Sequence, residues 1–463
     1  MLKTDGKYIE ALKEVLLDSN YLFLMNQLHG PSGFFDPWSQ FEVMKRALDH
    51  LESPYHHTLL LLQLGISAPR AQIEQETGKE TLNLILESGF WEERGGLIRC
   101  RNLVVLTYQG LYLATEINPW FETCKNKNTD IYIGSDSLRL AECIAWRKDA
   151  RVLDLCSGTG IQGLLAARSA RKVVSVEINP RTVPVTQFNI ELNCAGDVME
   201  VRMGDLYEVL DPTEQFDCIY ANPPFIPMLE NTTYPICGAG GEDGLAVLNR
   251  IIRWMPEHLA SGGEAVVFCE CLGDNKNVFF DREIEKMCME NGWTGLSSHP
   301  SRMNAGLQIQ KLSELTALFS ESFDKKDFKR RMSDVYTGLG AQYLYDTVLR
   351  IENNGSPSFK LINGYNPWHG ADMAQAADKV TFSYRDGLIA VLLDGRVVRT
   401  VTPDIAELIT TLDEGYNVEE SAKWLFHRYR KTLIGADVHF YGYLAAVLES
   451  CRMLEQDGVL ILR

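Results

Sequence analysis

Three apolar segments of the chain each run into a polar turn, and these turns constrain the fold more than any other feature. Arg151–Leu155 opens into the loop Cys156–Gly160, which is rich in glycine, and Lys172–Glu177 ends in an acid. Phe216–Tyr220 runs into the turn Asn222–Phe225, which has the sequence Asn-Pro-Pro-Phe. Apolar segments of this length are typical of buried parallel strands, and an open α/β sheet binds its ligands beyond the carboxyl ends of its strands. We therefore expect the three turns to meet around one ligand.

Further strands and helices are expected to alternate around these segments. They are strands at Glu200–Met203 and Glu264–Glu270, and helices at Ile161–Ala170 and Thr182–Asn193. The alternation predicts a Rossmann-like parallel sheet with helices on both faces. We expect Gly340–Ile351 to add a late strand at the edge of this sheet. Residues 129–353 are therefore predicted to form the central domain of an α/β protein.

Residues 1–128 are predicted to form a helical, winged-helix-like domain. Apolar residues have helical spacing over Tyr8–Leu17 and Gln40–Leu51. Three further helices are expected at Thr58–Leu64, Pro69–Glu76 and Glu80–Glu87. Trp91–Arg99 and Asn102–Tyr108 then predict a hairpin with a Gly-Gly turn.

The charges of this domain oppose DNA binding, which is one function of winged helices. Glu80 and Glu87 lie on the candidate recognition helix, and Glu74 and Glu76 lie on the helix before it. Four carboxylates at that surface would repel phosphate. We therefore favour a docking or substrate-covering role.

The turn-rich segment Asn353–Ser358 is expected to end the central domain. Residues 365–463 are then predicted to form a small α+β, winged-helix-like domain, with Asp386–Gly387 and Asp394–Gly395 as hairpin turns. Its strands are expected at Thr381–Tyr384, Leu388–Leu393, Val397–Val401 and Val459–Leu462, and its helices at Pro403–Leu412, Val418–Lys431 and Asp437–Leu454.

The composition is typical of a soluble globular protein. The chain has 463 residues, of which 45% are hydrophobic and 23% charged, and no apolar run approaches the roughly 18 residues that cross a bilayer. Met1–Lys7 is polar and lacks the apolar core of a secretion signal. The 11 cysteines are scattered, and Cys269 and Cys271 have no second pair to complete a zinc site. We expect a cytoplasmic protein with reduced thiols, no metal site and no membrane contact.

The loop Cys156–Gly160 allows a ligand to approach the backbone, because glycine lacks a Cβ and tolerates positive φ. The start of the helix after it is a natural anion site. Together with Gly163, the loop also matches the Gly-x-Gly-x-x-Gly pattern of nicotinamide-dependent enzymes. Two features oppose that alternative. Asp154 would place a negative charge near the pyrophosphate, and the Asn-Pro-Pro-Phe turn has no role in hydride transfer.

The turn Asn222–Phe225 carries the most functional information. Its prolines fix φ, but a rigid turn alone requires neither the asparagine nor the aromatic residue. We expect a cradle for a planar NH2 group, in which the Asn222 side-chain oxygen and the Pro223 carbonyl accept the two hydrogens and Phe225 stacks on the plane. Such a cradle would aim the nitrogen lone pair at an electrophile and lower the barrier without a strong base.

Together these motifs resemble those of the class I S-adenosylmethionine (AdoMet)-dependent methyltransferases with an Asn-Pro-Pro-aromatic turn. That group includes the HemK/PrmC-type glutamine-amide methyltransferases and the RsmC-type rRNA guanine-amino methyltransferases. The resemblance covers residues 131 to about 270. Phe225 is nearer to the rRNA type than the tyrosine usual in the glutamine enzymes, and Tyr132–Ser137 is similar to the segment that covers AdoMet in this group.

The resemblance implies that AdoMet is the cofactor. Asp154 would accept from its ammonium group, Glu177 would hold the ribose hydroxyls, and Ile178 and Asp205 would contact the adenine. The predicted cofactor-binding residues are Asp154, Ser157, Gly158, Thr159, Gly160, Glu177, Ile178, Asp205, Leu206 and Asn222, and the predicted catalytic residues are Asn222, Pro223 and Phe225. Tyr234–Gly244, which is rich in glycine and follows the turn, is expected to form a lid over the acceptor.

The C-terminal domain resembles the PqqD-like fold, whose members bind leader peptides. The resemblance lies in the order of its elements and in the runs Thr402–Ile409 and Asn417–Ala422. It implies that a peptide adds as a strand to an exposed sheet edge. A dimerisation or packing domain is the alternative.

The combined prediction is an N-methyltransferase that acts on a planar amide or amino nitrogen of a peptide, a protein or a small natural product. The net charge of −17 makes a nucleic acid a less favoured partner, because affinity for nucleic acids depends on Lys and Arg contacts with phosphate. The alternative is a nucleobase methyltransferase with a flipped base stacked on Phe225. A non-enzymatic AdoMet-binding protein and a carbon or oxygen acceptor are also consistent with these motifs.

Overall fold

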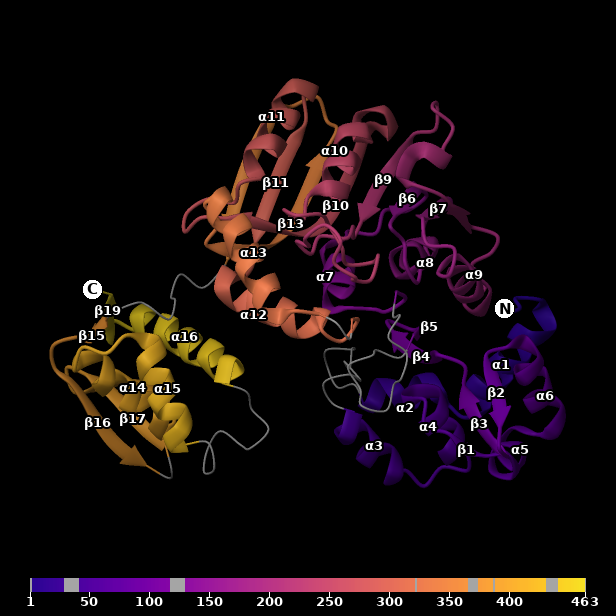
Figure 1. Ribbon diagram of the computed structural model, residues 1–463, viewed down its shortest axis with the longest axis horizontal. Coiled ribbons are helices and arrows are strands. Elements are labelled where there is room, and N and C mark those ends of the chain that lie inside the picture. The colour runs from indigo at the N-terminus through magenta and orange to yellow at the C-terminus, as the bar shows by residue number, and fades with distance from the viewer. Residues whose placement is uncertain are drawn as a thin grey trace. The chain divides into compact units, whose positions relative to one another are not determined.

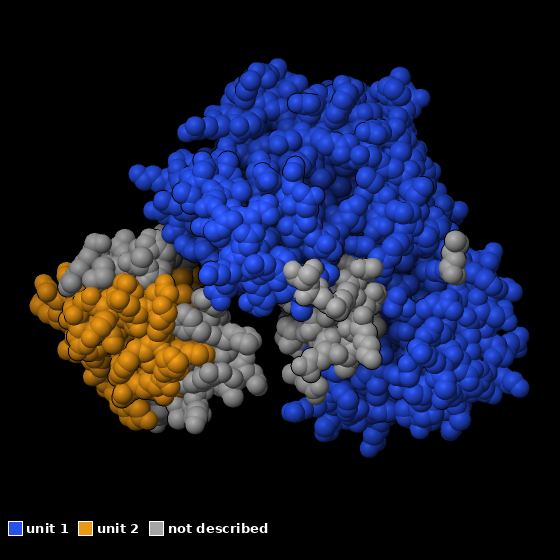
Figure 2. Space-filling view, in the orientation of Figure 1, with its two compact units in different colours: residues 1–363 blue, residues 364–463 orange. Residues whose placement is uncertain are grey.

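The computed structural model describes residues 2–28, 41–116, 130–320, 323–364, 374–385, 388–429 and 440–462. The chain forms two compact units, residues 1–363 and residues 364–463, which Figure 2 shows in blue and orange. None of the described helices is both long and apolar enough to span a bilayer.

The first unit is built on one large mixed sheet (Figure 1). Its strands are β6 (Arg151–Leu155), β7 (Lys172–Glu177), β8 (Met199–Met203), β9 (Phe216–Ala221), β10 (Leu259–Gly273), β11 (Thr294–His299), β12 (Arg302–Asn304), β13 (Tyr343–Glu352) and β14 (Ser358–Asn363). They lie in the order β14-β11-β13-β10-β9-β6-β7-β8, and β12 pairs with β13. The five strands from β10 to β8 in this order are parallel. The predicted Rossmann-like sheet is therefore confirmed, and its switch point lies between β6 and β9.

The far side of the sheet differs from the prediction. β13, the predicted edge strand, instead lies between β10 and β11 and is antiparallel to both. β14 then adds to β11 as a parallel edge strand. Because β14 ends at Asn363, the sheet continues ten residues beyond the boundary that the turns after Asn353 predict.

Helices cover this sheet, with α10 and α11 beside β10 and β11, and α8 and α9 beside β6, β7 and β8 (Figure 1). They are α7 (Ser135–Cys143), α8 (Ile161–Ala167), α9 (Val183–Leu192), the 3-10 turn η1 (Leu206–Val209), α10 (Ala246–His258), α11 (Asp281–Asn291), α12 (Ala305–Thr316) and α13 (Lys325–Leu339). Cys218 and Tyr220 of β9 and Val266 and Phe268 of β10 face one buried apolar cluster, which also holds Leu140 of α7. Side chains alternate along a strand, so the residue two beyond Tyr220 is directed toward α7.

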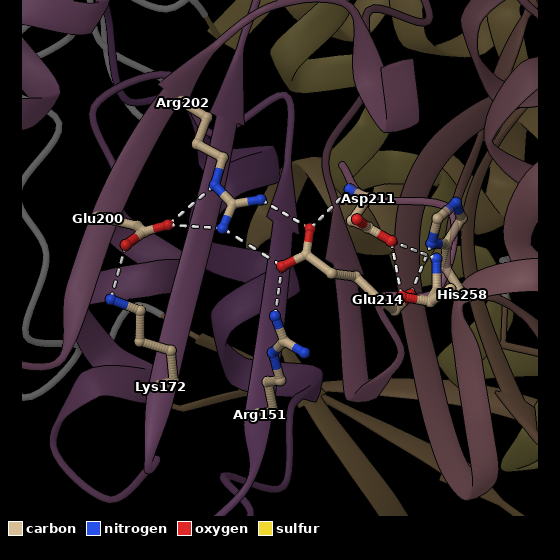
Figure 3. A network of polar contacts seen from close by, with 8 residues as sticks. Arg151, Lys172, Glu200, Arg202, Asp211, Glu214 and His258 are labelled. Carbon is tan, nitrogen blue, oxygen red and sulfur yellow. Dashed lines mark hydrogen bonds and ion pairs between the residues drawn. The ribbon is translucent and has the colours of Figure 1, made fainter. Parts of the chain in front are cut away.

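An ion-pair network stands at the opposite end of β6 and β7 from the predicted turns (Figure 3). Lys172 and Arg202 both pair with Glu200, and Arg202 also pairs with Glu214. Arg151 at the start of β6 pairs with Glu214 as well. These cations lower the pKa of Glu200 and of Glu214. The network joins the first strands of the sheet to the segment before β9.

The N-terminal part of the first unit contains the expected helices α1 (Gly6–Asp18), α3 (Phe41–Asp49), α4 (His56–Leu64), α5 (Arg70–Thr77) and α6 (Lys79–Ser88). It also contains α2 (Tyr21–Leu28), which the sequence analysis did not predict. Its strands are β1 (Ala68–Pro69), β2 (Trp91–Arg94), β3 (Leu97–Cys100), β4 (Leu103–Tyr108) and β5 (Leu111–Glu116). β1, β3 and β2 form a sheet in that order beside α4, α5 and α6, which is a winged-helix arrangement.

The predicted hairpin is wrong in its pairing. The Gly95-Gly96 turn joins β2 directly to β3, and β4 forms a separate hairpin with β5, a strand that we did not predict. Asn189 of α9 and Asn193, the residue after this helix, bind the backbone of β5: Asn193 Oδ1 accepts from Tyr112 N at 2.9 Å and Asn189 Oδ1 accepts from Ala114 N at 2.7 Å. The N-terminal part thus packs on α9. The boundary predicted at residue 128 falls in 117–129, outside the described residues.

One of the four carboxylates that argue against DNA binding is directed inward. Glu76 Oε2 accepts from the backbone N–H of Thr58 at 2.8 Å, and its Oε1 accepts from that of His57 at 3.1 Å. Glu76 therefore caps the start of α4. Glu80 and Glu87 are exposed, so their carboxylates would still face and repel phosphate at this surface.

The second unit combines short strands with three helices. They are β15 (Ala374–Ala376), β16 (Val380–Arg385), β17 (Leu388–Leu393), β18 (Arg396–Val401), β19 (Leu460–Leu462), α14 (Pro403–Asp413), α15 (Val418–Tyr429) and α16 (Phe440–Gln456). Positive φ at Asp394 and Gly395 forms the expected turn between β17 and β18. The other expected turn, Asp386–Gly387, lies outside the described residues. Asn417 and Glu420 accept from each other's backbone N–H at 2.8 and 3.1 Å and cap α15.

Candidate active site

The three predicted turns line one cavity at the carboxyl ends of β6, β7 and β9. Its walls contain Cys156–Thr159, Glu177–Asn179, Gly204–Leu206, Asn222, Pro224, Ile236, Cys237, Ala239, Val247 and Arg250, together with Asp130, Tyr132, Gly134, Asp136 and Ser137 before and within α7. The predicted residues that line it are Ser157, Gly158, Thr159, Glu177, Ile178, Asp205, Leu206 and Asn222. Asp154, Gly160, Pro223 and Phe225 are not part of its lining.

The loop after β6 depends on its glycines. Gly158 and Gly160 have φ of +52° and +83°, in the region where a Cβ is strained. A Cβ on Gly160 would also lie 2.9 Å from Thr186 Cγ2 of α9. Gly160 therefore allows the loop to pack closely against α9, and Gly158 lies on the side of the loop that faces the cavity.

Glu177 joins the end of β7 to this loop. Its Oε2 accepts from Gly158 N at 2.8 Å and its Oε1 accepts from Asn179 N at 2.8 Å. Burial raises the pKa of Glu177, and these backbone hydrogen bonds oppose that rise. Each carboxylate oxygen keeps a further lone pair, so Glu177 can still accept from hydroxyl groups in the cavity.

The structure contradicts the prediction that Asp154 faces the ligand. Its Oδ2 accepts from Gly163 N of α8 and Ser175 Oγ of β7, both at 3.1 Å, and only 1% of the residue is exposed. Val152 faces the buried cluster that α8 helps to form, and Asp154, two residues later, has the same direction. The carboxylate therefore joins β6 to α8 and β7 on the side of the glycine loop away from the cavity. It does not reach the cavity to meet an ammonium group.

Asp205 lies at the cavity wall but has a partner that the sequence did not suggest. Arg250 of α10, which also lines the cavity, places Nη2 3.0 Å from Asp205 Oδ2. Asp205 and Arg250 are far apart in the chain, and a lone arginine in a helix gives no signal of this role. The ion pair leaves the other Asp205 oxygen for a ligand.

Asn222 is held by two hydrogen bonds in the wall of the cavity. Its Nδ2 donates to Asp136 Oδ2 at 2.5 Å and to Ser137 Oγ at 3.2 Å. Its Oδ1 is buried and has no hydrogen-bond partner. Asp136 was missed by sequence reasoning, although Tyr132–Ser137 was recognised as a covering segment.

Phe225 is turned away from the predicted stacking position. Its ring meets Phe268 of β10 edge to face, with centroids 5.7 Å apart, and packs on the buried cluster under α7. Since Phe225 does not line the cavity, the structure does not support its stacking on an acceptor. Pro223 is buried in the turn itself.

The segment that is expected to form a lid, Tyr234–Gly244, lies along the cavity. Gly238 O accepts from Ile226 N at 2.8 Å, Ile226 O accepts from Gly240 N at 2.9 Å, and Gly241 O accepts from Met228 N at 2.7 Å. The glycine-rich segment is therefore paired with the residues that follow the turn. Close contact explains its glycines: a Cβ on Gly240 would lie 2.8 Å from Phe225 Cα.

Comparison with known proteins identifies the family. Residues 129–278 match the family described as methyltransferase small domain. A Methanocaldococcus jannaschii protein, assigned as a protein N5-glutamine methyltransferase, is 32% identical over 146 residues, which cover 30% of this chain and 72% of that protein. The chain belongs to the class I AdoMet-dependent methyltransferases.

Two other relatives share this methyltransferase domain. The ribosomal protein uL3 glutamine methyltransferase of Bordetella pertussis is 29% identical over 25% of this chain and 42% of its own length. The release factor glutamine methyltransferase of Rhodopirellula baltica is 28% identical over 26% of this chain and 45% of its own length. This methyltransferase therefore spans less than half the length of either relative.

The residues of this methyltransferase fit AdoMet, its methyl donor. Glu177 and Asp205 present carboxylate oxygens for hydroxyl and amino groups, and Ser157 Oγ is a buried oxygen without a partner at the glycine loop. Ile178 adds an apolar, half-exposed side chain to the wall. Among the residues that the structure describes, no group of three or more His, Cys, Asp or Glu could hold a metal ion.

Proposed function

We propose that this enzyme transfers the methyl group of AdoMet to a planar amide or amino nitrogen of a peptide or protein. The observation that carries the proposal is the Oδ1 atom of Asn222, a residue of the cavity wall; this oxygen is buried and has no partner. A lone acceptor oxygen in such a place is costly unless a ligand donates to it. An NH2 group is a donor of the required kind.

The relatives support a protein acceptor. Three of them are named for glutamine residues, and two of those names specify a ribosomal protein and a release factor. We extend only the acceptor class to this chain, a primary amide or amine on a polypeptide. A small natural product with the same group would meet the same requirement.

Bound AdoMet supplies an electrophilic methyl group on its sulfonium sulfur. In the proposed site, Ser157, Gly158, Thr159, Glu177, Ile178, Asp205 and Leu206 hold the cofactor. Asn222 Oδ1 accepts from one N–H group of the acceptor. This holds the nitrogen lone pair toward the cofactor, and the gain comes from orientation rather than from a strong base.

Isotope transfer tests this function. The full-length protein is incubated with methyl-labelled AdoMet and, separately, with peptides that carry glutamine, asparagine or a free amine, with total RNA and with DNA. We expect label in a peptide, located by mass spectrometry on a nitrogen, and its loss with Asn222→Ala. Label in RNA or DNA that falls steeply with salt would instead establish the nucleobase alternative.

The domain roles are further proposals. We propose that residues 1–128 cover or dock the substrate of the catalytic domain. We also propose that residues 365–463 bind a peptide, since β16 and β18 are the two edges of a three-stranded sheet and Tyr384 and Val397 on them are 72% and 55% exposed. Removal of residues 364–463 should then raise KM for a peptide acceptor and leave AdoMet affinity unchanged. We also propose that the enzyme acts in the cytoplasm, where thiols stay reduced.

A further inference from the structure

The orientation of the Asn222 amide decides what the cavity offers an acceptor. An amide has an accepting oxygen at one end and a donating NH2 at the other, and the two ends have almost the same shape. Oxygen toward the cavity accepts from an acceptor N–H, whereas NH2 in that place would repel it. Some other group must therefore select one of the two orientations.

We propose that Asp136 is the positioning residue that selects it, and this rests on the proposed function of Asn222. An ionised carboxylate only accepts hydrogen bonds, so Asp136 Oδ2, 2.5 Å from Asn222 Nδ2, requires the NH2 end to face it. Ser137 Oγ, 3.2 Å from the same nitrogen, is a second partner. Oδ1 is thereby left buried with no protein partner, and a donor on the acceptor would supply one.

The start of α7 holds Asp136 itself in place. The backbone N–H groups of Asp136 and Ser137 in the first turn of the helix lower the pKa of the carboxyl group and so favour its charged form. The carboxyl group also folds closely over Gly134, where a Cβ would lie 2.1 Å from Asp136 Oδ1. Gln162 Nε2 of α8 donates to Ser137 O at 2.8 Å. This hydrogen bond joins the first turn of α7, which carries Asp136, to α8, the helix that follows the glycine loop.

Protonation of Asp136 would remove the selection. A protonated carboxyl can donate to Asn222 Oδ1, and the amide could then turn its NH2 toward the acceptor. Burial raises the pKa of Asp136, while the hydrogen bond from Asn222 and the charge of Arg139 oppose that rise. Further ionisable groups whose charges interact with Asp136 include Tyr132 before α7, Cys237 of the glycine-rich wall and Glu270 of β10. Turnover should therefore fall when acidification protonates Asp136, and cofactor affinity should not fall with it.

A double-mutant cycle tests whether Asp136 acts through Asn222. Asp136→Asn, Asn222→Ala and the double variant are compared in turnover of a labelled glutaminyl peptide. We expect Asp136→Asn to lower kcat about tenfold or more, and the double variant to be no slower than Asn222→Ala alone. AdoMet affinity and melting temperature should match the wild type. Losses that multiply in the double variant would overturn the proposal, because Asp136 would then act independently of Asn222.

A spectroscopic measurement tests the same contact without an acceptor. The side-chain NH2 resonances of Asn222, assigned by their loss in Asn222→Ala, are followed against pH in the protein saturated with S-adenosylhomocysteine. We expect a shift on the acid side that Asp136→Asn abolishes, that Asp136→Glu retains in part and that Glu270→Gln leaves in place. A shift that survives in Asp136→Asn and disappears in Glu270→Gln would overturn the proposal.

The two proposals can fail separately. Full turnover by Asn222→Ala would refute the acceptor cradle, whatever Asp136 does. Loss of turnover in Asn222→Ala together with full turnover in Asp136→Asn would refute only the positioning role.

Discussion

The carboxylate of Glu177, at the carboxyl end of β7, accepts a hydrogen bond of 2.8 Å from the backbone N–H of Gly158 in the loop after β6. This contact joins two of the three turns that line the cavity. It also holds the carboxylate still, because the second oxygen accepts from Asn179 N at 2.8 Å. A preorganised acid binds hydroxyl groups at a smaller entropic cost than a free side chain does.

Glu177→Ala should weaken AdoMet binding about tenfold or more, which corresponds to at least about 1.4 kcal/mol. The variant removes the hydrogen-bond acceptor for the ribose and also loosens Gly158. Isothermal titration with AdoMet and with S-adenosylhomocysteine measures the change. Glu283→Ala, an exposed acid on α11, is the control and should bind normally. Unchanged affinity in Glu177→Ala would remove Glu177 from the ribose assignment.

Asn222→Ala should lower turnover by about two to three orders of magnitude, as expected when one preorganised polar group at a reaction centre is removed. AdoMet affinity should stay nearly the same, since Asn222 acts on the acceptor. Single-turnover kinetics together with cofactor titration separates the two effects. Asn249→Ala, at an exposed position of α10, provides the matched control. Equal loss of turnover and cofactor affinity would contradict the acceptor role.

The parallel strands could be predicted from the sequence because each is a short local pattern. β6 and β7 have the predicted bounds, and β9 differs by one residue. The place of β13 could not be predicted in this way. Its pairing with β10 and β11 is set by contacts across long stretches of chain, and nothing within Tyr343–Glu352 specifies its neighbours.

The same limit applies to the site. Glu177 and Asn222 were predicted because each ends a strand at the sheet's binding edge. Asp154 was assigned wrongly because a strand pattern alone does not say which face a helix covers, and α8 covers the face of Asp154. Asp136 and Arg250 were missed because they reach the cavity from helices distant in sequence from their partners.

Gly240→Ala should lower turnover with little change in AdoMet affinity. The added Cβ would lie 2.7 Å from Gly244 O and 2.8 Å from Phe225 Cα, distances at which the backbone of the turn or the wall must shift. Turnover of a labelled peptide and cofactor titration measure the two effects. In Gly338→Ala, within α13, the new Cβ meets nothing within 4 Å, so that variant should keep its activity and gain up to about 1 kcal/mol of stability. Full activity in Gly240→Ala would show that the turn tolerates displacement.

Asp154→Asn should change how stability depends on pH. Burial raises the pKa of Asp154 from 3.8 to about 7, and the hydrogen bonds from Ser175 and Gly163 only partly oppose this. The pKa of Asp154 is higher in the folded protein than in the unfolded chain. Asp154 therefore contributes fully to the stability of the wild type below about pH 4, and this contribution is lost as the pH rises to about 7.

The asparagine variant cannot ionise, yet its side-chain oxygen can still accept from Gly163 N and Ser175 Oγ. Between about pH 4 and about pH 7, the unfolding free energy of the wild type should therefore fall relative to that of Asp154→Asn, by on the order of a few kcal/mol. Urea unfolding at several pH values in this range measures it. Asp149→Asn, exposed before β6, controls for the loss of one negative charge. If the curves of the wild type and Asp154→Asn stayed parallel, Asp154 would have the same pKa in the folded and unfolded states.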